Sequence, residues 1–174
     1  LFKSTPMKTK ITFSILIFAA FYCNAQTQVA VIRDWVEHFA NQDSIMESPA
    51  ARDGDGNYYV AGYTLDENTG ADIVVAKYTI DGSLVWSDQF YQSSCYCRDQ
   101  ATAITVDENM NVYVTGITFT DSTNGFDYAT LMYEENGSRL WERYYNGNYA
   151  GGYDIPVAVC EKEGGIYVTG TSQD

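Results

Sequence analysis

Short stretches in which apolar residues recur at every second position, separated by small polar turns, run through the chain from residue 48 onward. Between residues 101 and 145 this pattern predicts four strands, over 101–106, 111–118, 127–133 and 138–145. Some strands are apolar on both alternations, as in DIVVAKY (72–78). A sheet that is apolar on both faces must be covered on both sides, so we expect sheets stacked face to face.

The connections between these strands carry turn residues. Asp81-Gly82 and Asn136-Gly137 predict two-residue type I′ hairpins, in which both central residues have positive φ. The polar pentapeptides DGDGN (53–57) and DENMN (107–111) predict longer turns. Four consecutive strands joined in this way make an antiparallel meander.

The meander repeats. The tetrapeptide YVAG at 59–62 returns as YVTG at 113–116 and 167–170, at intervals of 54 residues. The recurring positions are Tyr59, Gly62, Tyr113, Gly116, Tyr167 and Gly170, the aspartates Asp72 and Asp127, and the tryptophans Trp35, Trp86 and Trp141. Strict repetition favours a repeat protein over a β-sandwich. The expected fold is all-β: a β-propeller fragment of four-stranded antiparallel meander blades, about two and a half blades present, preceded by a signal-peptide helix.

The N-terminal segment has the layout of a secretory signal. Lys8 and Lys10 precede the apolar run ITFSILIFAAFY (11–22), and small residues end it at Ala25. We predict cleavage after Ala25 and a secreted or cell-surface location, with residues 1–6 upstream of the natural start at Met7. Twelve apolar residues are too few to span a bilayer, which takes about 20, so no transmembrane segment is expected after cleavage.

The mature region, 26–174, divides into a lone outer strand (29–39), a first blade (48–91), a second blade (101–145) and a partial third blade (155–174). The lone strand matches only the tryptophan-bearing fourth strand of the unit. Our hypothesis is that it completes the last blade of a closed ring in a longer protein. The remaining blades of the same chain are then expected partners.

The repeated tetrapeptide, YVAG or YVTG, is followed in the first two units by a strand that carries Asp72 or Asp127 and then by a Gly-x-x-x-Trp strand. In these motifs, from Ala30 to Asp174, the chain resembles the SBBP family of β-propeller repeats. The resemblance implies an exported bacterial protein, often large and modular, with seven blades and often a C-terminal sorting or adhesion module. The Asn-Ala-Gln signal end resembles those of gliding bacteria that use type IX secretion. The resemblance implies no catalytic residues.

The net charge limits the classes of expected partner, and the cysteine count limits the possible disulfides. Without residues 1–25 the chain has 7 basic and 23 acidic residues, a net charge of −16, which repels nucleic acid and anionic membranes. Three cysteines remain, Cys95, Cys97 and Cys160, and an odd number cannot pair completely. A disulfide between Cys160 and either Cys95 or Cys97 stays open as an alternative, but we expect Cys160, in a strand, to be a small buried residue.

Three sets of residues are candidate sites. Asp53, Asp55 and Asn57 resemble the start of a calcium loop, but Tyr58 and Thr64 stand where such a loop needs glycine and glutamate, so a turn is favoured and no cofactor is expected. Asp72 and Asp127 favour capping of loop N–H groups over a cation or sugar site. The periodic tryptophans favour core packing over sugar stacking.

No constellation for catalysis is recognisable, and His38 is the only histidine. We predict a binding scaffold for extracellular protein or glycan, acting through the loops 65–71, 92–98 and 146–153. Two alternatives stay open: an exported carbohydrate-active enzyme whose carboxylates lie in blades outside this sequence, and a structural spacer of a large surface protein.

Overall fold

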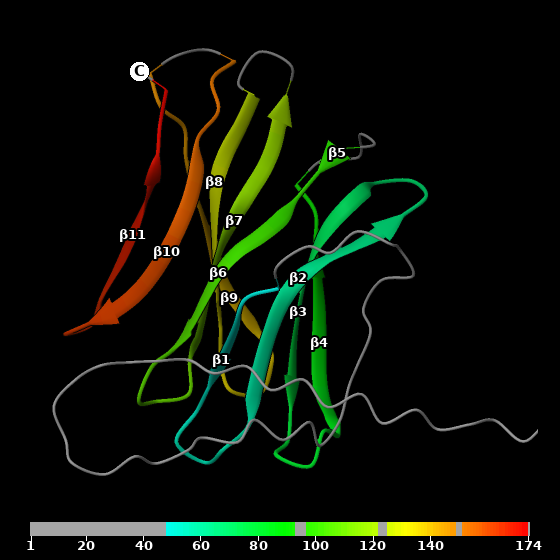
Figure 1. Ribbon diagram of the computed structural model, residues 1–174, viewed down its shortest axis with the longest axis vertical. Helices are drawn as coiled ribbons and strands as arrows, with labels where there is room; N and C mark the ends of the chain where they lie inside the picture. The colour runs from blue at the N-terminus through cyan, green and yellow to red at the C-terminus, as the bar shows by residue number, and fades with distance from the viewer. Residues whose placement is uncertain (1–47, 93–96, 122–124, 149–150, 174) are drawn as a thin grey trace, which may run out of the picture. The chain divides into compact units, whose positions relative to one another are not determined.

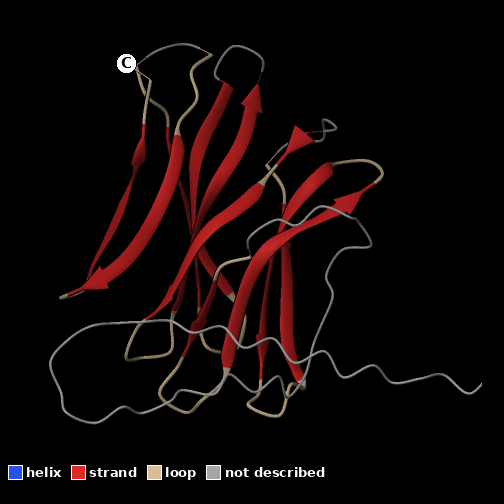
Figure 2. Ribbon diagram, viewed as in Figure 1, coloured by secondary structure: helices blue, strands red, loops and turns tan. Residues whose placement is uncertain are grey.

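The computed structural model describes residues 48–92, 97–121, 125–148 and 151–173, and every regular element in these ranges is a strand (Figures 1 and 2). The all-β prediction is therefore confirmed for the described residues. No helix there is long and apolar enough to cross a membrane. The predicted signal peptide and the lone strand with Trp35 and His38 lie outside the described residues, as does Cys95.

The first sheet is an antiparallel meander. Its strands follow one another in chain order: β1 (Ala50–Arg52), β2 (Tyr58–Asp66), β3 (Gly70–Tyr78) and β4 (Leu84–Phe90). A short strand, β5 (Cys97–Arg98), pairs in parallel with the start of β3. Aromatic and β-branched residues, as in YYVAGYTLD of β2, suit this pleated, half-buried surface.

The second sheet repeats the meander with β6 (Gln100–Val106), β7 (Val112–Asp121), β8 (Gly125–Tyr133) and β9 (Arg139–Tyr145). Each strand begins and ends within three residues of its predicted bounds. The third sheet has two described strands, β10 (Ile155–Lys162) and β11 (Gly165–Thr171), which pair antiparallel.

The hairpin turns differ from the prediction. Only the glycines Gly82 and Gly137 have positive φ, at 85° and 89°, so the two-residue type I′ assignment is wrong. The N–H of Gly82 donates to the carbonyl of Thr79, and the N–H of Thr79 donates to the carbonyl of Ser83. The loop therefore holds three residues, a type I turn followed by a left-handed glycine, which needs positive φ at one position only.

The two pentapeptide turns are confirmed, and they share one conformation. The N–H of Asp53 donates to the carbonyl of Asn57, and that of Asp107 donates to the carbonyl of Asn111. The fourth turn residue is left-handed in both, with φ of 92° at Gly56 and 64° at Met110. Met110 therefore occupies a conformation that glycine adopts without steric cost.

Replacing Met110 by glycine is expected to raise the free energy of unfolding by about 0.5–1 kcal/mol, because it removes the crowding of a side chain at positive φ. Urea unfolding of the two proteins measures this. Gly56→Ala is the reciprocal change and should destabilise, because it places a side chain at a φ of 92°, which residues other than glycine rarely adopt. Equal stabilities of the wild-type protein and the Met110→Gly variant would refute the strain argument.

The hydrophobic core lies between the first and second sheets. Ile73, Val75 and Phe90 of the first sheet belong to the same buried cluster as Val114, Leu131 and Tyr133 of the second. Burying a side chain of this kind stabilises a protein by about 1.5–3 kcal/mol. The two sheets therefore cover each other, as the two-sided apolar strands predicted.

The glycine of the repeated tetrapeptide lets two strands approach closely. A Cβ on Gly116 would lie 2.3 Å from the carbonyl oxygen of Gln100, and one on Gly170 would lie 2.1 Å from that of Ile155. In both sheets the first strand has a register shift at this point, between Ala101 and Ala103 in the second sheet. At Gly62 the nearest atom is only a serine hydroxyl, 3.2 Å away.

Cys160 is exposed on β10 and carries a free thiol, so the prediction of a small buried residue is wrong. It pairs with Tyr167 of β11, which is also exposed. Both residues lie on the face of the third sheet that no described strand covers.

Candidate functional site

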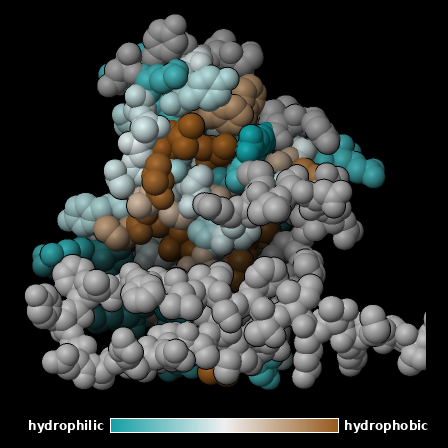
Figure 3. All heavy atoms as spheres, in the orientation of Figure 1, coloured by the Kyte–Doolittle hydropathy of each residue, from teal (hydrophilic) through white to brown (hydrophobic). Residues whose placement is uncertain are grey.

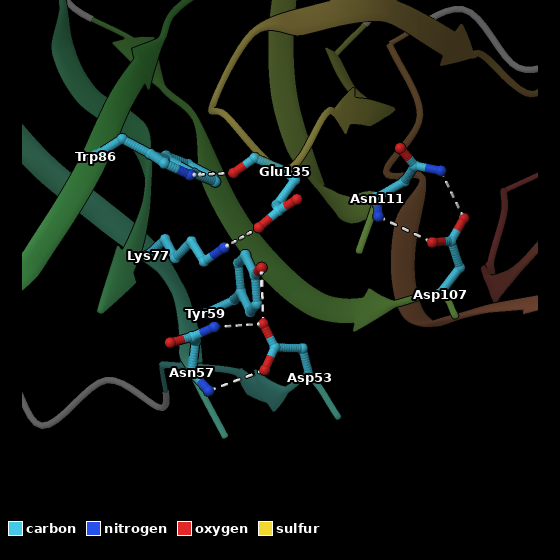
Figure 4. Close-up of polar contacts among 8 residues, drawn as sticks. All are labelled: Asp53, Asn57, Tyr59, Lys77, Trp86, Asp107, Asn111 and Glu135. Carbon is cyan, nitrogen blue, oxygen red and sulfur yellow. Dashed lines mark hydrogen bonds and ion pairs between the residues drawn. The ribbon is translucent and has the colours of Figure 1, made fainter. Parts of the chain in front are cut away.

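Asp53 is the centre of the first polar turn. Its carboxylate accepts hydrogen bonds from the backbone N–H and the side-chain amide of Asn57, both 2.8 Å, and from the Tyr59 hydroxyl at 3.1 Å (Figure 4). Burial raises the pKa of Asp53, but the hydrogen bonds from Asn57 and Tyr59 outweigh it and hold the pKa below 3.8. The Asp53 carboxylate therefore stabilises the turn, and Asp55 lies exposed at the tip of the turn.

The same arrangement occurs one repeat later. Asp107 accepts from the N–H and amide of Asn111, both 2.8 Å, and from the Tyr113 hydroxyl at 3.1 Å. Burial, followed by the bond to Asp107, raises the pKa of Tyr113 to about 12. Both hydrogen-bonded turns have the sequence D-x-x-x-N-x-Y, repeated after 54 residues, and this repetition is the signal by which the sequence identifies them.

Replacing Asp53 by asparagine is expected to cost about 1 kcal/mol at pH 7, because one oxygen acceptor becomes an amide donor facing other donors. The lowered pKa fixes the sign of the pH dependence: the ionised carboxylate stabilises above 3.8, and this contribution is lost as the pH falls through the pKa of the folded state. The difference in unfolding free energy between the two proteins should therefore shrink from pH 7 to pH 3. A constant difference would contradict this assignment.

Polar contacts join the first and second sheets beside Trp86. Its indole N–H donates to the carbonyl of Glu135 at 2.8 Å (Figure 4). The Trp86 ring also stacks on that of Tyr133, with centroids 5.7 Å apart. The Lys77 ammonium lies 3.2 Å from the Glu135 carboxylate. Burial alone would lower the pKa of Lys77, but its bonds to Tyr59 and Glu135 raise it, so the charge is kept.

Trp86 and Trp141, the two tryptophans among the described residues, both make packing contacts. Trp86 packs against the buried core, and Trp141 contacts Tyr113 with ring centroids 6.2 Å apart. Tyr59 and Trp86 make the matching contact in the first sheet, also at 6.2 Å. In each sheet the second-strand tyrosine and the fourth-strand tryptophan lie on either side of one third-strand residue, Lys77 or Met132.

Asp72 and Asp127 are buried near the starts of β3 and β8. The hydrogen bonds to Asp72 come from the Thr69 hydroxyl at 2.5 Å and the Gln89 amide at 2.6 Å, not from the loop N–H groups that were expected. The reason is that the loop N–H groups of Asn68 and Thr69 donate to the carboxylate of Asp66 instead, at 2.8 and 3.3 Å. Asp72 thereby ties β3 to β4 rather than capping the loop backbone.

Asp99 is a further buried carboxylate, and the sequence alone did not single it out. Its N–H donates to the carbonyl of Ala71 at 2.6 Å, and its side chain accepts from the N–H groups of Gln92 at 3.0 Å and Phe119 at 3.1 Å. The Thr118 hydroxyl donates to it as well, at 2.7 Å. Asp99 thus fastens the loop after β4 to the start of β3 and to the end of β7 in the next sheet.

Asp154 makes matching contacts one repeat later. The N–H of Asp154 donates to the carbonyl of Phe126 at 2.8 Å. Its carboxylate accepts from the N–H groups of Gly147 at 2.7 Å and Gln173 at 3.3 Å. Asp99 and Asp154 are 55 residues apart and each precedes a first strand, which is the signal that could have identified them. Burial, with the charge of Asp72 adding to it, raises the pKa of Asp99.

The loops held by these carboxylates present aromatic rings. Phe126 lies between Phe119 and Tyr153, with centroids 5.5 Å from each, and the rings of Phe126 and Tyr153 are stacked at 27°. Tyr153 is 53% exposed, and Tyr91, in the loop after β4, is also exposed. Of the three predicted binding loops, 65–71 is fully described, and 92–98 and 146–153 are described in part.

Among the described residues, no three His, Cys, Asp or Glu side chains come together as a metal-binding group. A comparison with known protein families finds no match, and a comparison with curated proteins finds none either. The site is therefore interpreted from its own geometry: buried aspartates that fix the loops, and exposed aromatic rings on those loops.

Proposed function

We propose that the chain is an exported β-propeller module of the SBBP type that binds extracellular protein or glycan through the loops following its second and fourth strands. Export rests on the predicted signal peptide ending at Ala25. The propeller rests on the repetition of four-stranded meanders that bury a common core. The acidic surface suits a neutral or cationic ligand.

One observation carries the binding proposal: the half-exposed ring of Tyr153, stacked on Phe126, stands on a loop that Asp154 holds in place. An exposed aromatic ring on a rigid support loses little entropy when it stacks on a sugar or packs against a protein side chain. Loops that are fixed by a scaffold are where binding residues concentrate.

The test is binding of the mature chain, residues 26–174, to a panel of immobilised neutral and basic glycans and to extracellular matrix proteins. We expect at least one class to be bound, and Tyr153→Ala to weaken that binding about tenfold, the effect of about 1.4 kcal/mol. Tyr167→Ala is the matched control, an exposed tyrosine outside these loops, and should bind normally. Binding that is unchanged in Tyr153→Ala, or absent from every class, would overturn the proposal.

A further inference from the structure

Among the described strands, the third sheet ends at β11, at the place where the first and second sheets continue with a third strand. β11 pairs with β10 alone among the described strands, whereas its counterparts β2 and β7 pair also with a third strand, β3 or β8. β11 shares the sequence YVTG with β7, so its free edge offers the same backbone groups in the same order. An unpaired edge of this kind is a template for another strand.

Side-chain exposure shows what the edge lacks. The equivalent tyrosines Tyr59, Tyr113 and Tyr167 are 0%, 7% and 61% exposed. The first two pack against the tryptophan of a fourth strand in their own sheet. Tyr167 is exposed because no described strand brings a tryptophan to it. Apolar residues are exposed on the other strand as well, and Figure 3 shows them gathered over β10.

A groove lies beside this edge, between the second and third sheets. It has a volume of about 430 Å³, and it is lined by Tyr128, Arg143 and Tyr145 of the second sheet and by Val168 and Gly170 of β11. At the corresponding place between the first and second sheets, Leu131 and Tyr133 of β8 are fully buried against the first sheet. The groove is therefore the space that a third strand of the third sheet would fill.

We propose that the β11 edge and this groove bind a β-hairpin of the same kind as β3–β4 and β8–β9. Its first strand would pair with β11 and place two large apolar side chains in the groove, as Leu131 and Tyr133 are placed on the first sheet. Its second strand would bring a tryptophan to Tyr167. The proposal rests on the stacked-repeat architecture proposed above, and the partner is identified by register, apolar alternation and the tryptophan.

The turn of the incoming hairpin would also find a hydrogen-bond donor on the second sheet. Between the first two sheets, the turn carbonyl of Glu135 accepts the indole N–H of Trp86, whose counterpart in the second sheet is Trp141. The incoming turn should supply the same carbonyl to Trp141. The ion pair of Lys77 with Glu135 has no counterpart, because Met132 stands at the lysine position.

The experiment titrates the mature chain with a synthetic peptide covering residues 125–145, which carries the β8–β9 hairpin. We expect one peptide bound per chain, and amide hydrogen exchange in β11 slowed at least about tenfold by the new backbone hydrogen bonds. The control is the same peptide with aspartate in place of both Leu131 and Tyr133, and it should not bind.

Variants of the chain locate the contact. Tyr145→Asp places a charge in the groove and should weaken peptide binding about tenfold, a loss of about 1.4 kcal/mol. Leu84→Asp introduces the same charge at an exposed apolar residue of β4 outside the groove, and should leave peptide binding unchanged. Neither the peptide nor these variants involve Tyr153, so this result is separate from that of the ligand panel.

Two outcomes would overturn the proposal. One is no change in β11 exchange at peptide concentrations of about 1 mM, where even weak strand addition is detectable. The other is a dimer of the chain, seen by sedimentation, that protects β11 and is not dispersed by the peptide, since a second copy would then occupy the edge.

Discussion

Replacing Gly116 by alanine is expected to destabilise the protein by about 3 kcal/mol or more, because the added methyl group has no space. Its Cβ would lie 2.3 Å from the carbonyl oxygen of Gln100 and 2.9 Å from Cα of Ala101. Both are backbone atoms of the neighbouring strand β6, so the clash can be relieved only by separating two paired strands. Urea unfolding monitored by tryptophan fluorescence measures the loss.

Two glycines serve as controls. Gly62 occupies the same position in the first repeat, but an added Cβ would meet only the side-chain hydroxyl of Ser48 at 3.2 Å, so Gly62→Ala should cost less than about 1 kcal/mol. Gly54 has no atom within 4 Å of an added Cβ, and Gly54→Ala should be close to neutral. Equal losses at Gly62 and Gly116 would show that backbone flexibility, and not strand contact, decides the cost.

Replacing Tyr59 by alanine is expected to destabilise the protein by about 3–5 kcal/mol, the range for a large aromatic residue removed from a core. The Tyr59 ring is fully buried between Trp86 and the Lys77 ammonium, and its hydroxyl donates to Asp53. The substitution therefore leaves a cavity and also removes one of the three hydrogen bonds that the Asp53 carboxylate accepts.

The same substitution at the equivalent position of the third sheet is the matched control. Tyr167→Ala should cost no more than about 0.5 kcal/mol, because that side chain is exposed. Chemical denaturation of both variants compares one residue type, at one place in the repeat, in two environments. A large loss for Tyr167→Ala would mean that this tyrosine is covered in solution.

The strands could be predicted from the sequence because local patterns determine them. The alternation of apolar residues and the spacing of the tetrapeptide predicted the strands of the second sheet to within three residues. The hairpin type was wrong because Asp-Gly and Asn-Gly are compatible with two loop lengths. The deciding property is the φ of Asp81 and Asn136, which depends on the register of the flanking strands and not on the dipeptide.

The buried aspartates show a second limit. Asp99 resembles any polar residue before a strand, and only the fold brings Ala71, Gln92 and Phe119 around it from three separate segments. Cys160 was misjudged for a related reason. Its place in an apolar strand predicted burial, but burial depends on a neighbouring sheet, and no described strand covers that face.

The most direct test of the account is a double-mutant cycle between Trp86 of the first sheet and Tyr133 of the second, each replaced by leucine. If successive repeats are joined by the stacking of these rings, the two losses should be coupled by about 0.5–1.5 kcal/mol. Losses that add to within about 0.3 kcal/mol would mean that the rings do not interact and that the repeats are not packed through their tryptophans.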